Sequence, residues 1–97
     1  MDMVIETVDY TIKEGSEEDF SRIFATLQKS FRETEGAMDV RLFRDNKDKN
    51  RFLLFMQWES EAGLEATRAN ADFDVWRLQS REMTGGPSVP RFYSETL

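Results

Sequence analysis

The sequence predicts an α+β fold in which a four-stranded antiparallel sheet carries its helices on one face. Two observations lead to it. Strand-like and helix-like apolar patterns follow one another in the order β-α-β-β-α-β. The only uninterrupted apolar run, Arg51–Ser60, has the length and the Phe and Leu content of a buried strand.

The first strand is expected from residue 4 to residue 12, where apolar and polar side chains alternate. Glu6 falls on the apolar side of this alternation. The simplest interpretation of Glu6 is a carboxylate at a frayed strand end that reaches solvent. Glu14 and Gly15 then end the strand.

The clearest helix follows, and Ser16 is expected to begin it with Asp19 in a shortened capping box. We expect this helix to end at Gly36, because glycine commonly follows the last helical turn. Its apolar side chains recur at helical spacing and are Phe20, Ile23, Phe24, Leu27 and Phe31.

A hairpin is predicted next, from a strand at Met38–Arg44, a polar connector at 45–50 and the apolar run. The acids and amides of the connector suggest a calcium loop. However, Arg51 stands where that loop needs glycine, and Gln57 stands where it needs its closing glutamate. A solvated turn is the better interpretation.

After the hairpin, Ser60 is expected to cap a second helix that runs to about Ala69. A break at 70–72 separates it from a further helix, for which Asp72 is the expected N-cap. That helix ends before Gly85, and a short strand at Arg91–Ser94 completes a ferredoxin-like order of elements.

The central strand is apolar on both faces, so it is expected in the interior of the sheet. Phe52, Leu54, Met56 and Trp58 share one face, while Leu53 and Phe55 lie on the other. A chain of 97 residues has helices enough for one face only. We therefore expect the face with Leu53 and Phe55 to meet a second copy in a homodimer.

The composition of the chain excludes several kinds of partner and catalytic site. The net charge of −6 disfavours nucleic acid as a partner. The chain has no Cys and no His, so zinc–sulfur sites, thiolate catalysis and histidine bases are excluded. No metal and no other cofactor are expected. Without a signal peptide or an apolar run of roughly 20 residues, the expectation is one soluble domain, residues 1–97, in the cytoplasm and not in a membrane.

Several short motifs, in this order and spacing, resemble the antibiotic biosynthesis monooxygenase family of the dimeric α+β barrel superfamily. The motifs are Lys13–Gly15, Glu35-Gly36, Leu42–Asp45, Trp58–Ala62 and Thr67–Phe73. The resemblance implies a homodimer whose two sheets face each other. It also implies oxidation of flat, electron-rich aromatic compounds by molecular oxygen without metal or flavin.

The chain departs from the family at two positions, because many relatives carry His where Thr67 and Asp72 stand. Haem-degrading members of the superfamily use a histidine ligand to iron, so the resemblance does not extend to haem degradation. For cofactor-free oxidation, the identity of the base stays open among Asp72, Glu6 and Tyr10. Asp72 ranks first because it stands at a family histidine position; the alternative is a plain N-cap.

A substrate pocket is expected between the helices and the sheet. Its expected lining is Val8, Tyr10, Leu54, Met56 and Trp58 from the sheet, with Phe73 and Trp76 closing it. The alternative is that these are ordinary core side chains. Arg68 is the candidate for binding an anionic substrate or its enolate, against the alternative of a solvated side chain.

Three functions remain open. The first is a cofactor-independent monooxygenase acting on a small quinol- or anthrone-like aromatic substrate. The second is a non-catalytic dimeric barrel, of stress-responsive or regulatory type, that holds a small apolar ligand. The third, a regulatory ligand-binding domain of the same arrangement, is less favoured because such domains usually accompany a second module.

Overall fold

The computed structural model describes residues 3–96 and has the predicted element order. The strands are β1 (Val4–Thr11), β2 (Ala37–Arg44), β3 (Arg51–Trp58) and β4 (Val89–Ser94). The helices are α1 (Glu17–Arg32), α2 (Glu61–Arg68) and α3 (Ala71–Met83). The strands form one antiparallel sheet in the order β2-β3-β1-β4, so the apolar run is an interior strand, as predicted.

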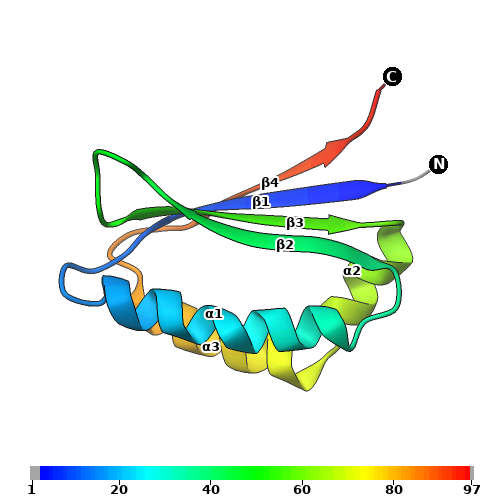
Figure 1. Ribbon diagram of the computed structural model, residues 1–97, viewed down its shortest axis with the longest axis horizontal. Helices are drawn as coiled ribbons and strands as arrows, with labels where there is room; N and C mark the ends of the chain where they lie inside the picture. Colours follow the sequence, from blue (N-terminus) through cyan, green and yellow to red (C-terminus); the bar gives the residue numbers. More distant parts are fainter. Residues whose placement is uncertain (1–2, 97) are drawn as a thin grey trace.

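All three helices lie on the same side of the sheet, and the opposite side carries no helix of the described chain (Figure 1). This is the expected α+β, ferredoxin-like arrangement. The two interior strands β1 and β3 pair along their whole length, with Val8 opposite Leu54 and Tyr10 opposite Phe52. These side chains face the helices and are buried, since residues directly opposite in a sheet share a face.

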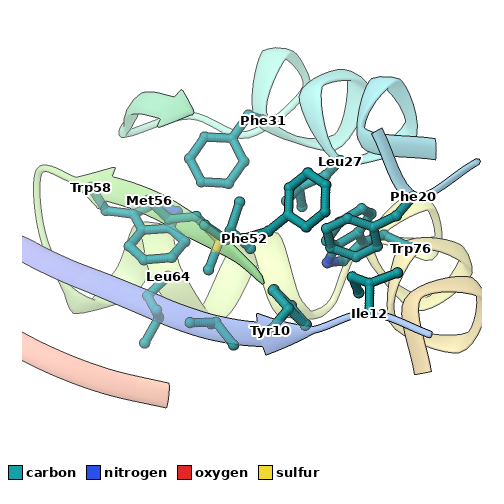
Figure 2. Close-up of a cluster of buried hydrophobic side chains, with 12 residues drawn as sticks. Tyr10, Ile12, Phe20, Leu27, Phe31, Phe52, Met56, Trp58, Leu64 and Trp76 are labelled. Carbon is teal, nitrogen blue, oxygen red and sulfur yellow. The ribbon is translucent and has the colours of Figure 1, made fainter. Parts of the chain in front are cut away.

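Aromatic side chains fill the layer between sheet and helices (Figure 2). Phe20 of α1 is central, with its ring 5.1 Å from Tyr10, 4.9 Å from Phe52 and 5.4 Å from Trp76 between centroids. Such tilted pairs contribute about 0.5–1.5 kcal/mol each beyond the area they bury. The core therefore locks α1 and α3 against the middle of the sheet.

The start and end of α1 differ from the prediction. Ser16 precedes the helix, but its side chain makes no capping hydrogen bond; instead Glu17 Oε1 accepts from the Gly15 N–H at 2.8 Å. The helix ends at Arg32 rather than Gly36, and Thr34 Oγ1 donates to the Ser30 carbonyl at 2.8 Å. A side-chain hydroxyl that donates to a helical carbonyl competes for that acceptor with the backbone N–H of the next turn. Gly36, at φ +87°, then redirects the chain into β2.

The junction between α2 and α3 also corrects a prediction. Asn70, not Asp72, caps α3, and its side chain accepts from the Asp72 N–H at 2.7 Å. Asp72 consequently lies inside the first turn, where the helix dipole favours a carboxylate. The last strand begins at Val89, two residues before the predicted start. None of the helices within residues 3–96 has the length and apolar character that a bilayer span requires.

Candidate active site

Glu6 is a buried carboxylate, so the expectation that it reaches solvent at a strand end is wrong. Strand β1 places it opposite Met56 of β3 and Phe92 of β4, on the face that the helices cover. Its one ionic partner among the described residues is Arg68, the last residue of α2, with Nη2 3.4 Å from Glu6 Oε1. A buried carboxylate requires such a partner, because an isolated charge is strongly disfavoured in the interior.

Burial raises the pKa of Glu6 above its ordinary value of 4.5, and the Arg68 charge opposes the rise without cancelling it. Burial also raises the pKa of Tyr10, which lies further along β1, and the negative charge of Glu6 adds to that rise. Glu6 therefore holds a proton more readily than an exposed carboxylate does. Tyr10 stays a neutral phenol, suited to donating a hydrogen bond.

A surface groove lies next to this ion pair, between α2 and the β1–β4 edge of the sheet. Its volume is about 280 Å³. Its lining mixes apolar side chains with polar ones, among them one cation and one acid, and consists of Val4, Glu61, Leu64, Arg68, Phe92, Tyr93 and Ser94. The Arg68 guanidinium carbon lies 5.5 Å from the centroid of the Phe92 ring, within range of a cation–π interaction. The groove thus combines an apolar wall, a fixed cation and a buried carboxylate behind it.

The side chains expected to line the pocket are brought together, but as packed core. Val8, Tyr10, Leu54, Met56, Trp58 and Trp76 are all buried in one cluster, and Phe73 packs half-buried at its margin. Figure 2 shows Tyr10, Met56, Trp58 and Trp76 of this cluster. The groove beside Arg68 is lined by none of them. In this single chain they match the core alternative, and their contribution to a site would be to hold Glu6 and Arg68 in place.

Thr67, at one of the two family histidine positions, has a structural partner. Its Oγ1 accepts a hydrogen bond from the Trp58 indole Nε1 at 2.9 Å, and both side chains are buried. A buried indole N–H needs such an acceptor. The bond ties the end of β3 to α2, and it also positions Arg68, the next residue in the chain.

Asp72, at the second family histidine position, lies at the surface between α3 and α1. Its Oδ2 binds Lys29 Nζ of α1 at 2.9 Å, and 26% of its side chain is exposed. The hydrogen bond from Lys29 lowers the pKa of Asp72 below 3.8. A lowered pKa makes a carboxylate a weaker base, so the structure removes the physical reason for ranking Asp72 first.

Sequence reasoning missed Phe92, Leu64 and Val4 as groove residues. The one signal that could have found them is Glu6, a charge on the apolar side of a strand, which implies a buried partner. No group of three His, Cys, Asp or Glu residues within residues 3–96 is arranged to hold a metal ion.

Solved structures share this fold along nearly the whole chain. A candidate antibiotic biosynthesis monooxygenase from Nitrosomonas europaea is 21% identical, with TM-score 0.88 over 96% of this chain and 89% of that one. SnoaB from Streptomyces nogalater, described as a cofactor-independent oxygenase, is 18% identical, with TM-score 0.88 over 100% and 96%. A candidate antibiotic biosynthesis monooxygenase from Bordetella bronchiseptica is 26% identical, with TM-score 0.83 over the full length of both chains.

Functionally curated proteins give no match to this sequence. The sequence model of the antibiotic biosynthesis monooxygenase family matches residues 3–78, well over half of the chain. The motifs that suggested the resemblance lie within that range. The chain therefore belongs to the antibiotic biosynthesis monooxygenase family.

Proposed function

We propose that this protein is a cofactor-independent monooxygenase that acts on a small quinol- or anthrone-like aromatic substrate. Family membership and the fold shared with SnoaB support the reaction class. The observation that carries the proposal is the buried Glu6 carboxylate, paired with Arg68 beside a groove with one apolar wall.

The reaction requires no redox group from the protein, because an electron-rich substrate reduces oxygen itself once it has lost a proton. In the overall balance for an anthrone, one oxygen atom becomes the new carbonyl oxygen. The other oxygen atom leaves as water with the two hydrogens of the oxidised carbon. The protein has to accept a proton, stabilise the anion and orient the ring in a dry site.

Among the three candidate bases, we assign proton removal to Glu6. Its raised pKa brings it closer to the acidity of an enol than an exposed carboxylate, and Arg68 stands ready to bind the resulting anion. Tyr10, with its raised pKa, stays protonated near neutral pH and so has no free phenolate to accept a proton. Asp72 is bound to Lys29 and has a lowered pKa, so we place it outside the mechanism.

We further propose that residues 1–97 act as one domain in a homodimer formed through the sheet face opposite the helices. That face carries Leu53 and Phe55 on β3, with Phe43 of β2 directly opposite Leu53. Strand β1 adds Ile5 to it, and β4 adds Tyr93 opposite Ile5. A second copy would remove these side chains from water.

Oxygen uptake tests the function. Purified protein, treated with chelator and free of flavin, is mixed with a panel of hydroquinones and anthrones in an oxygen electrode. We expect consumption that depends on active protein and exceeds autoxidation with heat-inactivated protein. No such consumption with any substrate, together with binding of the same compounds, would favour the non-catalytic ligand-binding barrel. That alternative is favoured by the absence of histidine at both family positions.

A further inference from the structure

We propose that Arg68, held against Phe92, exchanges partners: it binds Glu6 in the free protein and the anionic oxygen of a bound ligand in the complex. The groove would therefore select acidic phenols and enols that bind as singly charged anions. This inference rests on the proposed function, since it names the ligand class of the same site.

The two members of the ion pair differ sharply in exposure. Only 8% of the Glu6 side chain is exposed, against 47% of Arg68. A guanidinium has five N–H donors, and among the described residues Arg68 uses one of them, in a long bond of 3.4 Å to Glu6. The cation therefore turns one side to the buried carboxylate and has donors left for a ligand in the groove.

Phe92 holds the Arg68 guanidinium in position after the ion pair with Glu6 is broken. The register of β1 and β4 puts Phe92 directly opposite Glu6, so the ring and the carboxylate flank the same guanidinium. The Phe92 ring is 52% exposed and lines the groove, and Arg68 reaches the same groove from the end of α2. Phe92 is thus a positioning residue, which acts on the ligand through Arg68.

The exchange is a balanced proton transfer. The O–H bond of the phenol or enol breaks, and its proton forms a new O–H bond on the Glu6 carboxylate. One anion and one cation are present before and after the step, so no oxidant or counterion is needed. Neutral Glu6 is also easier to bury than the ionised form.

The surrounding charges restrict the ligand further. Glu61 of α2 lines the same groove and would repel a second negative charge on the ligand. Burial raises the pKa of Tyr10, so Tyr10 is a neutral phenol near neutral pH and adds no charge beside Glu6. An ordinary phenol is far weaker as an acid than a carboxyl group, so proton transfer to Glu6 favours ligands acidified by a conjugated carbonyl or a similar group.

Binding of para-nitrophenol tests the inference without any turnover, because its ionised form absorbs at a longer wavelength than its neutral form. The neutral comparator is para-nitroanisole, which has a similar shape and no acidic proton. Titrations are made below the pH at which the free phenol ionises, with calorimetry in two buffers of different ionisation enthalpy. For the wild type we expect the bound probe to be ionised, with no proton released to the buffer.

The variants separate the roles. Arg68→Gln should reduce the preference for the phenol over the anisole by roughly tenfold to a hundredfold, the usual effect of losing a charged hydrogen bond. Arg68→Lys keeps the charge and should restore part of the preference. Phe92→Leu should lose part of it, and Arg77→Gln, which removes a surface arginine of α3 paired with Asp74, should change nothing. Glu6→Gln cannot accept the proton, so the proton should appear in the buffer.

A bound probe that stays neutral would overturn the inference, as would an unchanged preference in Arg68→Gln or an unchanged proton balance in Glu6→Gln. The failure of the proposed function looks different. Ionised probe in the groove without oxygen uptake from any quinol or anthrone would leave the partner exchange standing and remove the monooxygenase. Oxygen uptake with the probe bound in its neutral form would support the monooxygenase and remove the partner exchange.

Discussion

Glu6 and Asp72 are carboxylates with opposite pKa shifts, and the signs follow from their surroundings. Burial raises the pKa of Glu6 above 4.5, so the folded chain holds that proton more tightly than the unfolded chain does. The stability that Glu6 contributes is present below pH 4.5 and is lost as the pH rises through the folded pKa. Asp72, with a pKa lowered below 3.8, contributes stability above pH 3.8 that is lost as the pH falls through the folded pKa.

Urea denaturation of the wild type, Glu6→Gln and Asp72→Asn over a series of pH values measures these signs. The free energy of unfolding of the wild type should fall relative to that of Glu6→Gln as the pH rises. The free energy of unfolding of the wild type should rise relative to that of Asp72→Asn as the pH rises through the lower range in which Asp72 loses its proton. Parallel curves for wild type and Glu6→Gln would show that burial does not perturb Glu6.

Thr67 gives a second prediction at the scale of single residues. Thr67→Val keeps the shape of the side chain but leaves the buried Trp58 N–H without its acceptor at 2.9 Å. We expect a loss of about 1–3 kcal/mol in the free energy of unfolding, measured by chemical denaturation. Thr67→Ser, which retains the hydroxyl, should lose less. Equal losses in the two variants would mean that packing, rather than the hydrogen bond, decides the position.

At the scale of elements, the first turn of α2 is positioned by its close approach to the β3 end and the α1–β2 turn. A Cβ added to Gly63 would lie 3.2 Å from Trp58 Cδ1 and 3.3 Å from the Gly36 carbonyl oxygen. Both neighbours are held in place, since Trp58 is buried and the Gly36 carbonyl accepts from the Glu59 N–H at 2.8 Å.

Gly63→Ala should therefore destabilise the protein by about 1–3 kcal/mol, although alanine is favoured over glycine in helices by about 1 kcal/mol. Thermal and urea unfolding measure the change. Gly86→Ala is the matched control, because a Cβ there meets nothing within 4 Å, and it should be neutral or slightly stabilising. A stabilised Gly63→Ala would show that α2 shifts freely on the sheet.

At the scale of the whole molecule, one sheet face is covered by helices and the other is open (Figure 1). We expect light scattering to give twice the chain mass of 11.4 kDa for the wild type. Phe55→Lys places a charge in the open face and should give monomer or aggregate. Leu78→Lys, a similar change at an exposed position on α3, should leave the dimer intact. A wild type that runs as a compact monomer at micromolar concentration would contradict the dimer.

The sequence was sufficient for the order of elements, because the alternation around Val8 and the helical stripe around Phe20 are local signals. It was not sufficient for the Glu6–Arg68 pair, whose members lie 62 residues apart and meet only through the packing of α2 on the sheet. The cap of α3 was ambiguous for a related reason. Asn70 and Asp72 are both good caps, and the position of the break between two helices selects one of them.

The most direct test of the central claim compares initial rates of oxygen uptake for Glu6→Gln, Asp72→Asn and the surface control Asp74→Asn, with the best substrate of the panel. If Glu6 is the base, Glu6→Gln should lose about a hundredfold to ten-thousandfold in rate, the usual effect of removing a general base. Asp72→Asn and Asp74→Asn should keep rates near that of the wild type. A Glu6→Gln variant with wild-type rate, or a comparable loss in Asp72→Asn, would contradict the assignment of Glu6.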